Sequence, residues 1–80
     1  MRLDKYLKIA RIIKRRTIAN EACDAGRVSV NGKIARASYD VKVGDIIEVA
    51  FGTRNVNLQV TSVLETVKNE DVADLYKIVQ

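Results

Sequence analysis

The sequence contains no histidine, proline or tryptophan, and Cys23 is its only cysteine. Without histidine the chain lacks the usual general base at neutral pH and the commonest metal ligand, so we expect no catalytic triad, metal or other cofactor. One cysteine excludes an internal disulfide and fits a reducing compartment, and the alanines around Cys23 favour a core position.

No apolar run approaches the roughly 18 residues that span a bilayer, and residues 1–8 do not resemble a signal peptide. We therefore expect a cytoplasmic protein without membrane contact.

Eighty residues suffice for one small domain, with 48% apolar and 30% charged residues. This composition is that of a folded chain and is too apolar for disorder. We therefore expect residues 1–80 to form a single domain.

Positive charge is concentrated in the first part of the chain. Residues 1–36 carry a formal charge of +7 and residues 37–80 carry −3, which together give the net +4. A basic half on a small folded domain indicates a polyanionic partner.

Helical periodicity marks the beginning of the chain. Leu3, Tyr6, Leu7 and Ala10 follow the spacing i, i+3, i+4, i+7, which predicts a helix from residue 3 to residue 10 or 12. Tyr6 lies in this apolar stripe, so a core role is favoured over stacking on a base. Asp4 lies in the first turn, where its charge suits the helix dipole and can also orient a neighbouring arginine.

A second helix is predicted over residues 18–25. Thr17 has the chemistry of an N-cap, and Gly26 supplies the left-handed position that commonly ends a helix. The helix would pack on the first through small side chains: Ile18, Ala19, Ala22, Cys23 and Ala25.

Strand signals follow Gly26. Asn31-Gly32 predicts a type I′ hairpin that pairs Val30 with Lys33 and has short arms, with Ile34 facing away from the valines. Alternation predicts a strand of about six residues ending at Phe51, a loop over 52–55, and an antiparallel strand over 56–61. Near the end, a turn after Asn69 and a strand over 76–79 are favoured over a helical turn. The predicted class is α+β, with two short N-terminal helices packed on a small antiparallel sheet.

Three cations, Lys14, Arg15 and Arg16, directly precede the second helix. A helix N-terminus already carries partial positive charge, so these cations favour a bound anion there, and phosphate suits such a site. Arg2 and Lys5 at the start of the first helix, with Lys33 on the hairpin, offer further positive surfaces. The alternative is a solvated basic loop. For Lys8 taken alone, solvent exposure is the simpler interpretation, and turn geometry alone accounts for Asn31.

Structured RNA is the polyanion that fits best. Two short helices and a turn also resemble a helix-turn-helix, so DNA stays a candidate, but the second helix exposes few residues able to read bases. Membrane headgroups are less suitable because the first helix has no Trp or Phe on its apolar face. Recognition of RNA by backbone and shape needs no base-reading helix.

Three segments resemble a known family in the right order: residues 2–7 (RLDKYL), 14–19 (KRRTIA) and 25–32 (AGRVSVNG). They match the patterns R-L-D-x-x-L, R-[ST]-x-A and G-x-V-x-V-N-G of the small RNA-binding domain first named for the fourth protein of the small ribosomal subunit. The resemblance implies an alpha-L-like RNA-binding fold with its motif core in residues 1–50.

The stand-alone members of this family that act in bacterial ribosome-associated quality control are similar almost end to end. This resemblance implies binding to 23S rRNA and a peptidyl-site tRNA on a stalled, split large ribosomal subunit, where a tail-elongating partner protein extends the nascent chain. In that case the protein is not an enzyme, and we expect a monomer. The alternative is a heat-shock-type recycling factor for large subunits carrying peptidyl-tRNA, although the basic C-terminal extension of that type is missing here.

The resemblance also bears on individual residues. Arg2 and Arg16 match the arginines that carry rRNA binding in the family, and Asp4 and Lys5 match its first-helix signature. The full set of expected RNA-binding residues is Arg2, Asp4, Lys5, Lys8, Lys14, Arg15, Arg16, Thr17, Asn31 and Lys33.

Overall fold

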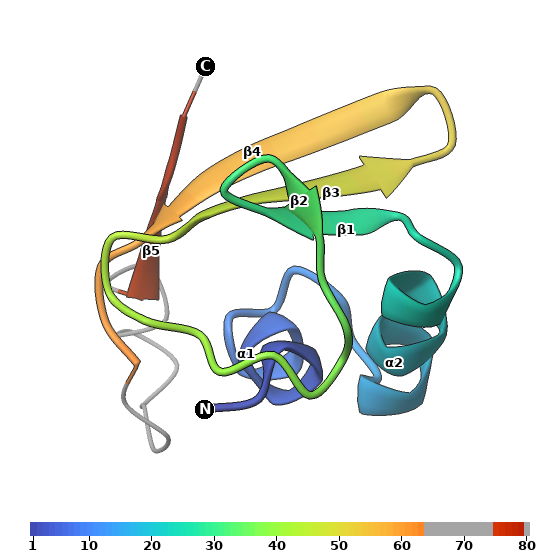
Figure 1. The fold of residues 1–80 in the computed structure, drawn as a ribbon, viewed down its shortest axis with the longest axis horizontal. Coiled ribbons are helices and arrows are strands. Elements are labelled where there is room, and N and C mark those ends of the chain that lie inside the picture. Colours follow the sequence, from blue (N-terminus) through green and yellow to red (C-terminus); the bar gives the residue numbers. More distant parts are fainter. Residues whose placement is uncertain (64–74, 80) are drawn as a thin grey trace.

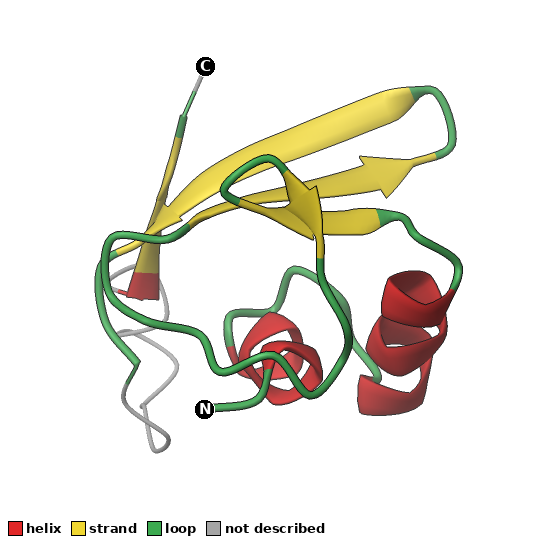
Figure 2. Cartoon of the chain, in the orientation of Figure 1, coloured by secondary structure: helices red, strands yellow, loops and turns green. Residues whose placement is uncertain are grey.

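Five antiparallel strands form one sheet in the order β2-β1-β3-β4-β5, and two helices pack on one face of it (Figure 1, Figure 2). The computed structural model describes residues 1–63 and 75–79. The elements are α1 Leu3–Ile9, α2 Arg16–Asp24, β1 Val28–Val30, β2 Lys33–Ile34, β3 Ile46–Phe51, β4 Arg54–Val60 and β5 Tyr76–Ile78. The predicted α+β class, with two N-terminal helices on an antiparallel sheet, is confirmed. Among the described residues, no helix is both long enough and apolar enough to cross a membrane.

The predicted apolar stripe of α1 forms the centre of the core. Leu3, Tyr6, Leu7 and Ala10 are fully buried, and the Tyr6 hydroxyl donates a hydrogen bond of 2.6 Å to the carbonyl of Leu75, just before β5. The core position predicted for Tyr6 is therefore confirmed. α1 ends at Ile9, and the chain turns away at Arg11, whose φ of +59° lies in the left-handed region.

The start of α2 differs from the sequence prediction. The helix begins at Arg16 with extended Arg15 as its N-cap, and no side chain caps it, so the prediction that Thr17 is the cap is wrong. The physical reason is an ion pair between Arg16 and Asp4 of α1, which fixes Arg16 within the first turn. Gly26 has φ +74° beyond the end of the helix, as predicted.

The predicted packing face of α2 is only partly correct. Ala19 and Cys23 are buried and Ala22 is partly buried, so the core position predicted for Cys23 is confirmed. Ile18 and Ala25, however, are exposed. With the helix beginning at Arg16, these two side chains fall outside the narrow stripe that faces α1 and the sheet.

The hairpins follow the predicted pattern closely. Asn31 and Gly32 both have positive φ, Val30 pairs with Lys33, and the arms are short. Ile34 faces away from the core and is 71% exposed. The loop predicted over 52–55 is shorter than expected, because Phe51 pairs directly with Arg54 across a two-residue turn.

β5 confirms the predicted C-terminal strand at Tyr76 and ends at Ile78. The expected turn after Asn69 lies outside the described residues.

The segment between β2 and β3 crosses the start of α1 (Figure 1). The amides of Leu3 and Asp4 donate to the carbonyls of Tyr39 and Ala37 at 2.8 and 3.2 Å. The crossing segment is in turn fixed by buried Asp45, whose carboxylate accepts hydrogen bonds from Asn31 Nδ2, the Tyr39 hydroxyl and the Lys42 amide. The crossing segment therefore anchors the first turn of α1, which follows Arg2 and includes Asp4.

Candidate nucleic-acid interface

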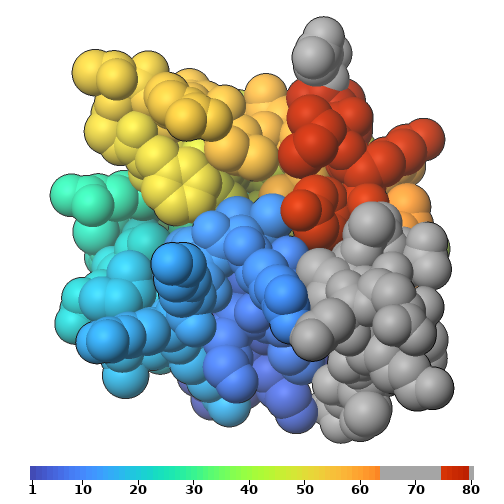
Figure 3. Space-filling model, turned by 180° about the vertical axis from the view of Figure 1, so that it is seen from behind, coloured from blue at the N-terminus to red at the C-terminus, as the bar shows by residue number. Residues whose placement is uncertain are grey.

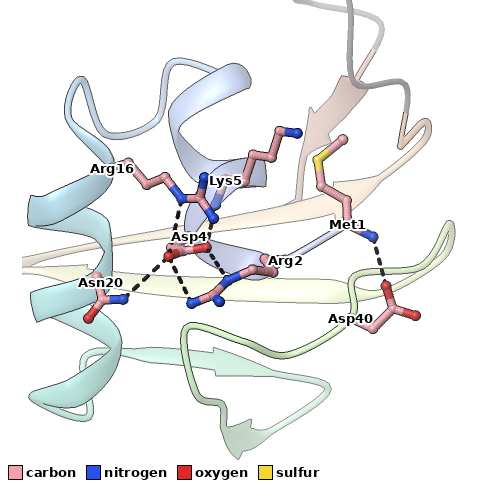
Figure 4. A network of polar contacts seen from close by, with 7 residues as sticks. All are labelled: Met1, Arg2, Asp4, Lys5, Arg16, Asn20 and Asp40. Atoms are coloured by element: carbon pink, nitrogen blue, oxygen red, sulfur yellow. Dashed lines mark hydrogen bonds and ion pairs between the residues drawn. The ribbon is translucent and has the colours of Figure 1, made fainter.

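The Asp4 carboxylate lies where the first turns of α1 and α2 meet. Arg2 Nε lies 3.2 Å from Oδ1, and Arg16 Nε lies 3.4 Å from Oδ2. Asn20 Nδ2, one turn beyond Arg16, donates to Oδ2 at 3.3 Å, and the Lys5 amide donates to Oδ1 at 2.8 Å. Figure 4 shows the two guanidinium groups on either side of this single carboxylate. Two cations from different segments, Arg2 and Arg16, thus converge on one carboxylate.

One buried anion therefore holds two half-exposed cations. The Asp4 side chain is 2% exposed, whereas those of Arg2 and Arg16 are 50% and 46% exposed. Burial by itself raises the pKa of Asp4, but the hydrogen bonds from Arg2, Asn20, the Lys5 amide and Arg16 outweigh it and lower that pKa. Asp4 is thus ionised at neutral pH and holds both arginines by ion pairs. The three side chains together retain one net positive charge.

The first turn of α2 adds backbone donors to this surface. Within the described part of the chain, the amides of Arg16, Thr17 and Ile18 donate to no acceptor. By contrast, the amides of Leu3, Asp4 and Lys5 in α1 all have acceptors. Free amides at a helix N-terminus attract phosphate oxygens, so α2 rather than α1 has the helix end with donors available to an anion.

A shallow hollow on the surface brings these groups together. It is lined by Arg2, Asp4, Arg16, Thr17, Asn20 and Glu21. We call this hollow the arginine site. Glu21 adds a second carboxylate, so the two arginines and two acidic residues that line the hollow have formal charges that sum to zero.

Other predicted residues lie outside the arginine site. Lys5 contributes its backbone amide, and its side chain points away from Asp4 in Figure 4. Lys8 is exposed one helical turn beyond Asp4, and Arg15 is exposed at the N-cap of α2. Lys14 lines a different hollow, next to Phe51. The structure therefore separates Lys14 from Arg16, although they are neighbours in the predicted basic cluster.

The hairpin residues form a third region. Asn31 Nδ2 donates to Asp45, and Asn31 Oδ1 accepts from the Ile46 amide at 3.0 Å, so this side chain joins the hairpin to β3. Exposed Lys33 lines a hollow together with Arg36 and Ser38.

Sequence reasoning did not place Asn20 beside Asp4 or Arg36 in one hollow with Lys33. Asn20 lies four residues after Arg16, so helical spacing places both on one face, and that spacing was an available signal. Arg36 lies beside Ala37, whose carbonyl accepts from Asp4. No local pattern indicates this contact, because it depends on the crossing segment.

Comparison with known proteins shows the family of this chain. Residues 1–47 match the S4 domain, and the chain belongs to the S4 domain family. It is 51% identical over 80 residues to the RQC P-site tRNA stabilizing factor of Bacillus subtilis, covering 100% of this chain and 93% of that protein. The protein of the same name from Halalkalibacterium halodurans is 49% identical over 78 residues, covering 98% of this chain and 89% of that protein.

A solved structure shows the same fold. The trimeric structure of heat shock protein 15 from Vibrio cholerae has a TM-score of 0.90 and 28% identity to this chain. The match covers 99% of this chain and 81% of the other.

Proposed function

We propose that this chain binds 23S rRNA on the large ribosomal subunit and holds a peptidyl-site tRNA in place, with Arg2 and Arg16 contacting RNA phosphates. The relatives named as P-site tRNA stabilizing factors support the tRNA part of this proposal. In this function the protein acts as a binding factor and not as an enzyme. By this proposal the protein acts in the cytoplasm, because the ribosomes are there.

The observation that carries the proposal is the arrangement of Arg2, Asp4 and Arg16. Two guanidinium groups from different helices are held about half exposed over one buried carboxylate, beside the free amides of α2. Guanidinium groups bind phosphate oxygens in a planar, two-pronged geometry, and holding them in advance reduces the entropy lost on binding. This arrangement fits recognition of a nucleic-acid backbone by shape.

The remaining predicted residues extend the proposed interface. Lys33 and Arg36 line a separate hollow beside the hairpin, and Arg15 is the N-cap of α2. We include Lys5, Lys8, Thr17 and Asn31 as secondary contacts, and leave out Lys14 because it lies in a different hollow. By this account a tail-elongating quality-control protein works on the same large subunit, and our chain binds there as a monomer.

Sedimentation of lysates tests the proposal directly. A tagged copy of the full chain should travel with free large subunits that carry peptidyl-tRNA, and Arg16→Ala should shift most of it to the top of the gradient. Arg54→Ala is the matched control, because Arg54 is exposed on β4 away from the arginine site. Asp4 keeps its hydrogen bonds from Arg2, Asn20 and the Lys5 amide when Arg16 is removed, so Arg16→Ala should melt only slightly earlier than the parent. If Arg16→Ala and Arg54→Ala sediment like the parent protein, the arginine site does not bind the ribosome.

A recycling factor of the heat-shock type is the second candidate, favoured by the close match of folds. The two candidate functions differ in what happens to the peptidyl-tRNA. A stabilizing factor should bind large subunits carrying peptidyl-tRNA more tightly than empty ones and should support tail addition in a reconstituted reaction. A recycling factor should promote release of the tRNA instead. Competition between an rRNA helix and duplex DNA at one salt concentration tests for a general DNA binder.

A further inference from the structure

A second hollow lies behind α2, between the segment that precedes this helix and the end of β3. Its lining is mostly apolar and includes Ile12, Ile18, Ala22 and Phe51. Two of these large side chains are conspicuously exposed, Ile18 at 48% and Phe51 at 41%. Figure 3 shows this side of the molecule, where the yellow end of β3 lies against the blue segment before α2. We call this feature the Phe51 hollow.

The Phe51 hollow and the arginine site lie on different flanks of α2. Arg16 and Asn20 face Asp4, whereas Ile18 and Ala22 face the Phe51 hollow. A shift of two residues in an α-helix turns a side chain through more than half a revolution. A group bound at the arginine site and a group bound in the Phe51 hollow would therefore contact different flanks of α2.

The charged side chains that line the Phe51 hollow are both positive. Lys14 and Arg27 line it, and no acidic residue does so within the part of the chain that the structure describes. Neither cation forms an ion pair with any described residue. An apolar floor with unpaired cations at its edge is complementary to a ligand that combines an apolar group with carboxylates.

The lining also distinguishes between a peptide and a nucleobase. Among the described residues, no uncharged polar side chain lines the hollow, and the Ala50 amide already donates to the Arg27 carbonyl at 2.9 Å. A base-binding pocket needs groups that pair with the polar base edge. Aliphatic Ile12, Ile18 and Ala22 instead suit an aliphatic or aromatic side chain of a protein.

We propose that the Phe51 hollow is a docking site for a short acidic segment of a partner protein. One large apolar side chain of that segment enters between Ile18 and Phe51, and flanking Asp or Glu carboxylates contact Lys14 and Arg27. The inference does not depend on the RNA-binding function, since it uses the opposite flank of α2. It gives the chain two separate surfaces, one for nucleic acid and one for protein.

Selection from a random peptide library tests the proposal. Twelve-residue peptides displayed on phage are selected on the full chain, and the enriched sequences are made with a fluorescein label for anisotropy measurements. They should carry Leu, Phe or Trp beside Asp or Glu. Ile18→Glu should weaken their binding about tenfold or more, because it removes apolar contact and adds a repelling charge. Val43→Glu is the matched control, since Val43 is 62% exposed outside the hollow, and it should bind as the parent does.

A charge exchange keeps the test decisive even if Ile18→Glu folds poorly. Arg27→Glu should weaken the acidic peptide and strengthen a version of it with Lys in place of Asp and Glu. Arg16→Ala should leave peptide affinity unchanged. Peptides without acidic residues, or equal affinity for parent and Arg27→Glu, overturn the proposal. Oligouridylate binding or self-association that is lost in Ile18→Glu overturns it as well, because the occupant is then RNA or a second copy of the chain.

Discussion

Arg16 contacts Asp4 through Nε at 3.4 Å and thereby joins the first turn of α2 to the first turn of α1. The Asp4 carboxylate is buried and its partner is half exposed, so the pair has an inner, fixed side and an outer, accessible side. This asymmetry distinguishes it from an ordinary surface ion pair, where both side chains move freely and little energy is gained. The same carboxylate also fixes Arg2 and Asn20. Asp4 is thus the residue on which the geometry of the arginine site depends.

Asp4→Asn separates positioning from net charge. If Asp4 only neutralised its neighbours, removing its charge would strengthen RNA binding. We expect the reverse: the affinity for RNA should fall about three- to tenfold, because Arg2 and Arg16 are no longer held together. Filter binding of large subunits measures the effect. Asp24→Asn makes the same charge change at the exposed end of α2, and should bind slightly more tightly. Tighter binding by Asp4→Asn as well would contradict the positioning role.

Acid should destabilise the protein through Asp45 and Asp4. Hydrogen bonds from the Lys42 amide, Asn31 and Tyr39 overcome the effect of burial and lower the pKa of Asp45 below its ordinary value of 3.8. A carboxyl whose pKa is lower in the folded state stabilises the fold fully above its unfolded pKa. This stability is then lost as the pH falls through the folded pKa. Urea midpoints should therefore be steady near neutrality and fall below about pH 4.

Asp45→Asn isolates this contribution. At pH 7 the variant should be less stable by about 1–3 kcal/mol, since it loses the charge at a buried, triply hydrogen-bonded position. Its stability should change less with acid than that of the parent, so the two curves approach each other below about pH 4. Parallel curves across this range would show that Asp45 does not contribute to the acid sensitivity.

Tyr6→Phe tests the attachment of the last strand to α1. It removes the hydrogen bond of 2.6 Å from the buried hydroxyl to the Leu75 carbonyl. We expect a loss of about 1 kcal/mol in the free energy of unfolding, with large-subunit binding unchanged. Tyr76→Phe is the control, because the Tyr76 hydroxyl donates no hydrogen bond to a described residue. Equal stability of the two variants in urea unfolding would rule out a structural role for the Tyr6 hydroxyl.

Cys23 should be chemically inert in the folded protein. Burial, followed by the nearby charges of Asp4 and Asp24, raises the pKa of its thiol to about 11, and the residue is 3% exposed. The thiolate is the reactive form, so at pH 8 a disulfide reagent such as dithionitrobenzoate should react slowly with native protein and rapidly in urea. Rapid reaction of native protein would mean that α2 opens readily.

Patterns that depend on neighbouring residues predicted much of the fold. The stripe from Leu3 to Ala10, the Asn31-Gly32 turn and the alternation in β3 and β4 are all local, and each is confirmed. The end of α1 was harder to place, because it falls before Arg11, a residue type that seldom adopts positive φ.

Contacts between distant residues explain what sequence reasoning missed. Thr17 looks like a cap until the contact of Arg16 with Asp4, twelve residues earlier, brings Arg16 into the helix. Lys14 and Arg16 are neighbours in sequence, yet the turn into α2 sends them to different flanks. Phe51 alternates with buried Ile47 and Val49 but is 41% exposed, because it lies at the end of β3, where the core no longer covers the sheet.

The salt dependence of large-subunit binding tests the central claim most directly. If the parent neutralises about five phosphates, the slope of log affinity against log salt concentration should be about −4, and in the double variant Arg2→Ala/Arg16→Ala it should be about −2. The double variant Lys42→Ala/Arg54→Ala removes the same charge from exposed positions outside the arginine site and should keep the parent slope. An unchanged slope in Arg2→Ala/Arg16→Ala would show that these two arginines do not contact phosphates.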